Sequence, residues 1–208
     1  MINQEAKMAR PPAIKRDTPV RLTLDVRSIG LTDDQFFRLC SDNRDFGFEM
    51  TARGELIVMS PTNPETDRRN ATVTTLLGIW ARQDGTGVFF GSSAIFILPN
   101  GAKRSPDGAW IPKSRWNRFT TEEKEQFTQI CPDFVIELRS PSDRLADVEE
   151  KMEEYIGNGA KLGWLLDPIE NRATIYRPGH PPERIDTPTI LGGDPVLPGF
   201  NFDFNEIR

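Results

Sequence analysis

A short apolar run interrupted by one carboxylate constrains the fold of this chain most. Residues 134–138 read FVIEL, a compact run that is typical of a β-strand buried on both faces of a sheet. Glu137 lies inside this run. Because burial of an unpaired carboxylate is unfavourable, Glu137 needs a metal ion, a cation or several hydrogen-bond donors beside it. A structural ion pair would meet the same requirement, so both interpretations stay open at this point.

Two other charged residues stand in a suggestive order around Glu137. Asp107 follows a proline at the start of another apolar run, and Lys151 lies on the helix predicted over residues 143–156. Two carboxylates on neighbouring strands can hold a hard cation such as Mg²⁺, and a nearby ammonium can stabilise charge on an attacked phosphate. Each residue also has an ordinary explanation. Pro-Asp pairs are common in turns, and Asp147 with Lys151 forms an i,i+4 pair of a helix surface.

Local signals predict an α/β fold in which one mixed sheet is flanked by helices. Capping residues begin two helices, at Thr32 with Gln35 and at Asn63 with a proline in the first helical position. A short helix is expected after Thr120. The predicted strands are short apolar or alternating runs between turn residues. They cover residues 46–51, 55–60, 87–90, 94–98, 107–111, 134–138, 164–167 and 173–176.

The whole chain, residues 1–208, is expected to form a single domain. Residues 1–20 are polar and contain several prolines, and they are expected to form a flexible arm. The tail after Pro178 is rich in proline and glycine and is expected to wrap the surface.

Composition excludes several classes of site. The chain has one histidine and two cysteines without metal-ligand spacing, so a zinc centre built on these residues is excluded. No apolar run approaches the ~20 residues of a membrane span, and the N-terminus lacks a secretory core, so a cytoplasmic protein without membrane contact is expected. The net charge of −5 argues against broad, non-specific nucleic-acid binding. A local acidic site neutralised by a bound cation remains compatible with it.

Several motifs together resemble one known family. They are FEM and GEL of the first hairpin (48–50 and 54–56), SPD (105–107), VIELRSPSD (135–143), then Lys151, Tyr155, Gly159 and WLLDP (164–168). This pattern resembles the Uma2-like family, also called DUF820, of the PD-(D/E)XK nuclease superfamily, and its cyanobacterial branch in particular. The resemblance runs over residues 31–178 and implies a restriction-endonuclease-like core.

The resemblance implies a role for each charged residue of the pattern. Asp107 and Glu137 match the two metal-binding acids of the family, and Lys151 matches the lysine of the following helix. The superfamily usually places this lysine two residues after the second acid, where this chain has Arg139. Arginine is always protonated and cannot act as a base. Catalysis therefore depends on whether Lys151 reaches the space beside the acids.

The implied activity is hydrolysis of DNA phosphodiester bonds by an endonuclease that uses Mg²⁺ or Mn²⁺. The backbone carbonyl of Leu138 would join the two acids as a metal ligand, and Glu49 is a further candidate ligand with Glu55 as its rival. Candidate phosphate contacts are Arg68, Arg69, Lys103, Arg104 and Arg139. A homodimer is compatible with this activity, since cutting both strands commonly takes two active sites. Two alternatives stay open: a catalytically silent nucleic-acid-binding module and a protein-interaction domain on the same fold.

Overall fold

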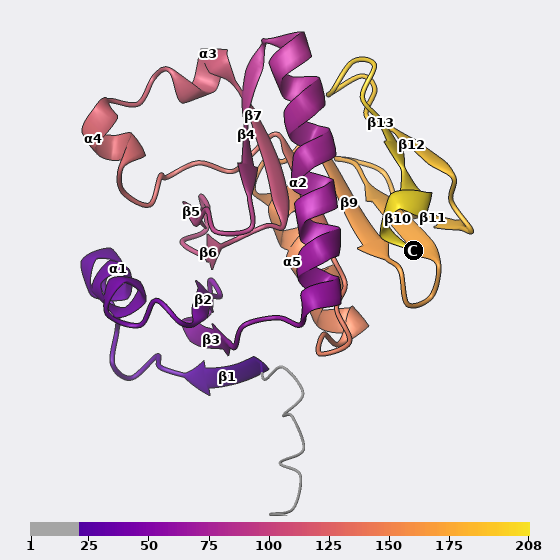
Figure 1. The fold of residues 1–208 in the computed structure, drawn as a ribbon. Helices are drawn as coiled ribbons and strands as arrows, with labels where there is room; N and C mark the ends of the chain where they lie inside the picture. The colour runs from indigo at the N-terminus through magenta and orange to yellow at the C-terminus, as the bar shows by residue number, and fades with distance from the viewer. Residues whose placement is uncertain (1–20) are drawn as a thin grey trace, which may run out of the picture.

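A mixed six-stranded sheet forms the centre of the molecule. The computed structural model describes residues 21–208 (Figure 1), so the arm predicted over residues 1–20 lies outside the described residues. The strand order is β11-β10-β9-β8-β7-β4. The strands are β4 (Gly87–Gly91), β7 (Gly108–Pro112), β8 (Phe134–Leu138), β9 (Leu162–Asp167), β10 (Arg172–Tyr176) and β11 (Glu183–Asp186). β8 and β9 run parallel, and the other neighbouring strands are antiparallel.

The interior strand β8 is buried along its whole length, as its apolar run predicts. Its side chains alternate between the two faces of the sheet with a period of two. Phe134, Ile136 and Leu138 pack in the apolar cluster that includes α2, whereas Val135 packs in the cluster that includes α5. Since Glu137 shares the face of Val135, its carboxylate is directed toward α5.

Two helices cover the two faces of this sheet (Figure 1). α2 (Pro64–Asp84) begins after Asn63, whose side chain accepts a hydrogen bond from the Thr66 backbone N–H, and it ends at Gly85 with φ of 70°. α5 (Leu145–Gly157) connects β8 to β9 and provides the crossover that a parallel pair requires. Both helices confirm the predictions within two residues at each end.

The N-terminal hairpin belongs to a second sheet, so the expectation of one sheet is wrong. This sheet has the order β1-β3-β2-β6-β5. Its strands are β1 (Arg21–Asp25), β2 (Gly47–Met50), β3 (Glu55–Met59), β5 (Phe96–Ile97) and β6 (Lys103–Arg104). The two-residue strand β6 pairs with β2 through Met50 and Lys103, a link too short to leave a periodic signal. α1 (Asp33–Asp42) begins with the predicted capping box and packs Phe36 against the hairpin.

The C-terminal tail contributes to the core, so the expectation that it wraps the surface is also wrong. It forms β12 (Ile190–Gly192), β13 (Asn201–Asp203) and the 3₁₀ turn η1 (Phe204–Ile207). The ring of Phe200 stacks on Trp164 of β9, with centroids 5.6 Å apart. Phe202 is fully buried in the same cluster. The tail therefore completes the apolar layer on the α2 side of the six-stranded sheet.

Two short helices precede β8. α3 is Lys113–Trp116. α4, the short helix predicted after Thr120, is Thr121–Lys124 and begins with a capping box at Thr120. None of the helices between residues 21 and 208 combines the length and the apolar character that a bilayer crossing requires.

Candidate functional site

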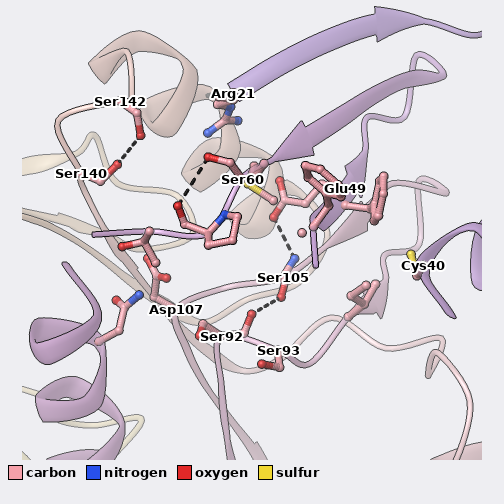
Figure 2. Close-up of a pocket in the computed structure, with 18 of the residues that line it drawn as sticks. Arg21, Cys40, Glu49, Ser60, Ser92, Ser93, Ser105, Asp107, Ser140 and Ser142 are labelled. Atoms are coloured by element: carbon pink, nitrogen blue, oxygen red, sulfur yellow. Dashed lines mark hydrogen bonds between the residues drawn. The ribbon is translucent and has the colours of Figure 1, made fainter. Parts of the chain in front are cut away.

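Residues of both large sheets, together with residues of α1, α2 and α5, line a cleft of about 740 Å³ (Figure 2). Its charged lining consists of three cations and five acids: Arg21, Arg44, Lys151, Asp45, Glu49, Asp107, Glu137 and Asp143. Carboxylates therefore outnumber cations on its walls. A lining of this charge favours cations, and a bound cation would restore the local positive potential that an anionic ligand needs.

Among the buried and half-buried acids of the cleft, Asp107 has the least compensation. It precedes Gly108, the residue of β7 that pairs with Ile136 of β8, and its carboxylate is partly exposed to the cleft. Oδ2 accepts a hydrogen bond of 2.8 Å from the backbone N–H of Leu138. Among residues 21–208, no lysine or arginine forms an ion pair with Asp107. Because N–H and C=O of one strand residue point to the same side, the Leu138 carbonyl is directed to the same edge.

Lys151 reaches from α5 into the space between two buried acids. Its Nζ lies 2.8 Å from Oε1 of Glu137 and 2.6 Å from Oε1 of Glu49. Nζ also donates to the backbone carbonyl of Ser105 at 3.2 Å. These three acceptors match the three N–H donors of an ammonium. The lysine of the helix therefore contacts the second acid, although it does not belong to the acid's own strand.

Glu49 anchors this arrangement from β2. Its side chain is fully buried, Oε1 accepts the backbone N–H of Ser105 at 2.9 Å (Figure 2), and Oε2 pairs with Arg104 at 3.2 Å. These bonds and the ion pair with Lys151 occupy both carboxylate oxygens of Glu49 inside the protein. Glu49 therefore holds Lys151 in place. Its rival Glu55 lies outside the cleft lining and bonds to residues of its own hairpin turn.

Burial and mutual repulsion separate the proton affinities of these groups. Desolvation raises the pKa of Asp107 to about 6. The Leu138 N–H and the charge of Lys151 oppose this rise, and the charges of Asp143 and Glu49 add to it. Burial also raises the pKa of Glu137, and although Lys151 opposes the rise, Asp107 and Glu49 reinforce it. Burial alone would raise the pKa of Glu49, but Lys151 and a neighbouring arginine outweigh it and lower that pKa. Burial alone would lower the pKa of Lys151, but Glu137 and Glu49 raise it, so the ammonium stays charged.

Comparison with known proteins places this arrangement in a family. A model of the family Uma2, described as "Putative restriction endonuclease", matches residues 33–205. The chain belongs to the Uma2 family. It is also similar to a crystal structure from Anabaena variabilis described as "a putative nuclease belonging to DUF820", with 19% sequence identity and a TM-score of 0.69. The similarity covers 85% of this chain and 97% of that chain, and it shows a shared fold. No curated protein matches the chain.

The predicted family and the predicted fold class are thereby confirmed. Helices flank a mixed sheet, the matching family model is described as "Putative restriction endonuclease", and the fold is shared with the DUF820 crystal structure. The second sheet and the buried tail extend this core beyond what the sequence predicted.

The oxygens available in this Uma2 site fit a hard divalent cation. Among residues 21–208, no three His, Cys, Asp or Glu side chains gather closely enough to hold a metal ion by themselves. The donors that the cleft offers to such a cation are the carboxylates of Asp107 and Glu137, with the Leu138 carbonyl at the same edge. Glu137 receives Lys151 and the Tyr155 hydroxyl on Oε1, so Oε2 is the oxygen that remains for a further ligand. Mg²⁺ commonly keeps several waters or phosphate oxygens beside one or two carboxylates, which suits this small set.

The five candidate phosphate contacts lie outside the cleft lining. Each forms an ion pair elsewhere: Arg68 and Arg69 with Glu65, Lys103 with Asp33, Arg104 with Glu49 and Glu154, and Arg139 with Asp167. Arg104 shapes the site from behind, through Glu49. The structure thus brings the two acids and Lys151 together in the cleft lining, whereas none of these five cations lines the cleft.

The sequence assigned no role to two groups that hold the site. Tyr155 donates its hydroxyl to Glu137 at 3.1 Å, and its position four residues after Lys151 on the same helix face was the available signal. The backbone of Ser105 contributes both an N–H to Glu49 and a carbonyl to Lys151. Backbone contacts of this kind leave no trace in residue type.

Proposed function

We propose that this Uma2 protein is an endonuclease that hydrolyses phosphodiester bonds of DNA with Mg²⁺ or Mn²⁺. One observation carries the proposal: Asp107 has no cationic partner among residues 21–208, yet it lines the same cleft as Glu137 and the charged Lys151. An acid without a partner beside a second acid is the arrangement that a divalent cation stabilises. Family membership supports the same activity.

Asp107, Glu137 and the Leu138 carbonyl would hold the cation. When bound, a divalent metal supplies a water of lowered pKa and polarises a phosphoryl oxygen. The protein's own contribution is placement. The Leu138 N–H orients Asp107 through Oδ2, while Lys151 and Tyr155 fix Glu137 through Oε1. One oxygen of each carboxylate is thereby held by the protein, and the other oxygen, Oδ1 of Asp107 and Oε2 of Glu137, remains for the metal ion.

Lys151 has a positioning role before substrate enters and a charge-stabilising role afterwards. All three of its N–H donors are used, and the longest bond is that of 3.2 Å to the Ser105 carbonyl. Exchanging this bond for a phosphate oxygen would place a positive charge where negative charge develops in the transition state. Glu49 keeps the ammonium in place during this exchange, because its bond to Nζ is the shortest of the three.

Cleavage of plasmid and single-stranded DNA tests the proposal. Asp107→Asn and Glu137→Gln should reduce Mg²⁺-dependent cleavage to background, and Lys151→Met should reduce its rate by about 10²–10³-fold. Matched controls are Asp133→Asn and Lys161→Met, which change a buried acid and its lysine partner outside the cleft. Both controls should keep wild-type rates at temperatures below their melting points. Equal rates in Asp107→Asn and Asp133→Asn would contradict the proposal.

A catalytically silent nucleic-acid-binding module is the second candidate function. It is favoured by the full use of the Lys151 donors, since this lysine reaches no substrate without breaking a bond. This candidate predicts DNA binding without cleavage in either metal. The melting temperature with and without Mg²⁺ or Mn²⁺ separates it from a purely structural role, because a structural ion pair gives no metal-dependent rise.

A further inference from the structure

Two phenyl rings are exposed on the same cleft as the acids. Phe37 of α1 is 40% exposed and Phe46, just before β2, is 49% exposed. Both line the cleft, whereas the other large apolar side chains that are exposed among residues 21–208 lie outside its lining. The exposed large apolar side chains of the cleft are therefore both aromatic.

Neighbouring rings hold both phenyl groups in place. Phe127 packs edge-on against Phe37, with centroids 5.0 Å apart, and Phe48 lies 6.4 Å from Phe46 at a tilt of 60°. Phe127 and Phe48 line the cleft as well. Phe36 is fully buried beneath and contacts Phe127 at 5.8 Å. Phe37 and Phe46 are thus the outer members of a packed aromatic group, which we call the aromatic wall.

Polar side chains of the kinds that contact phosphate line the same cleft. Arg44 lines the cleft and donates Nε–H to the carbonyl of Ser41, and no carboxylate among residues 21–208 forms an ion pair with it. Hydroxyl groups of Ser92 and Ser93 also lie at the cleft (Figure 2). Arginine and serine side chains are frequent partners of phosphate oxygens.

We infer that this cleft binds single-stranded DNA, with unpaired bases stacking on Phe37 and Phe46 and the backbone passing toward Asp107 and Glu137. Bases of a B-form duplex are stacked on each other, so their faces cannot reach a protein side chain. Unpaired bases stack on aromatic side chains without a strong sequence preference. The inference rests on the proposed nuclease function for the cut itself, whereas the stacking can be measured without cleavage.

Binding of three fluorescent probes tests the inference. The probes are a thymidine oligonucleotide, the same length of abasic deoxyribose phosphate, and a duplex of equal length. They are titrated in Mg²⁺ against the Asp107→Asn protein, which is expected not to cut. Adding Phe37→Leu or Phe46→Leu keeps apolar bulk but removes the ring. The matched control is Phe119→Leu, a partly buried phenylalanine outside the cleft lining.

Each cleft variant should weaken binding of the thymidine probe by about 5- to 100-fold, the range of base–aromatic stacking. Binding of the abasic and duplex probes should change by less than about twofold, and Phe119→Leu should leave all three unchanged. Equal weakening of the three probes, or no preference for the thymidine probe over the abasic probe, overturns the inference.

Parallel cleavage assays with wild-type Asp107 keep the two proposals separate. Base-dependent binding through the phenyl rings without any cleavage would refute the nuclease proposal alone. Metal-dependent cleavage of single strands at full rate and full affinity in Phe37→Leu and Phe46→Leu would refute the stacking alone.

Discussion

Two clusters of buried charge in this molecule differ in their balance. In the first, Asp133 is fully buried and pairs with two cations, Arg115 and Lys161. In the second, at the cleft, the three acids Glu49, Asp107 and Glu137 lie around two cations, Lys151 and Arg104, and the arginine also pairs with Glu154. Burial of an acid therefore does not by itself mark a site. The excess of negative charge, concentrated on Asp107, distinguishes the cleft cluster from a structural ion pair.

Removing the lysine from each cluster should give the largest difference in stability between the two clusters. Lys151→Met leaves Glu49 and Glu137 buried without their shared cation, which should lower the free energy of unfolding by about 3–5 kcal/mol. Lys161 is 60% exposed, so Lys161→Met should lower it by only about 0–1 kcal/mol. Urea unfolding at neutral pH without divalent metal measures both. Similar losses in the two variants would mean that the clusters are energetically alike.

The two acids that share Lys151 should respond to neutralisation with opposite signs. The lowered pKa of Glu49 means that its ionised form stabilises the fold above its usual pKa of about 4.5, and that this contribution is lost as pH falls through the lowered value. Glu49→Gln should therefore destabilise the protein at neutral pH, by about 2 kcal/mol for a charged hydrogen-bonded group.

The raised pKa of Glu137 gives the opposite pH dependence of stability. Its ionised form is disfavoured in the fold, so stability falls as pH rises from its usual pKa through the raised value. Glu137→Gln removes this fall, so the free energy of unfolding of this variant should equal or exceed that of the wild type at alkaline pH without metal. Unfolding curves from pH 5 to 9 for wild type and both variants check this pair. A destabilised Glu137→Gln at alkaline pH would show that Glu137 is a structural acid like Asp133.

Local sequence signals predicted much of the fold, but contacts between segments far apart in the sequence were not predicted. The bounds of β8 agree with its apolar run, and α2 begins after its predicted cap. The second sheet was missed because β6 joins β2 through only two residues. The tail was misassigned because its prolines and glycines obscured the alternation of Phe200, Phe202 and Phe204, which pack into the core.

The same distinction holds in the site. Asp107, Glu137 and Lys151 were identifiable because each breaks a local pattern or matches a family motif. The ion-pair partners of Arg104 and Arg139 could not be identified from the sequence, because a long side chain with several donors can pair with any acid that the fold brings within reach. The exposed rings of Phe37 and Phe46 are ordinary members of an apolar pattern in the sequence, and their place on the cleft follows from tertiary structure.

The smallest expected effect is a pH dependence of metal affinity that separates the two proposed metal-binding acids, Asp107 and Glu137. A bound cation requires both carboxylates to be ionised, so protons compete with it. Since the pKa of Asp107 is about 6, Mn²⁺ affinity should fall below that pH by about tenfold per pH unit for this group alone. Glu137, with its raised pKa, should add a second dependence that extends to higher pH. Titration calorimetry with Mn²⁺ on wild type and Asp107→Asn from pH 5 to 8 separates these two pH dependences. If the variant binds Mn²⁺ at all, its profile should lack the steeper fall below pH 6, whereas an unchanged profile would place the metal away from Asp107.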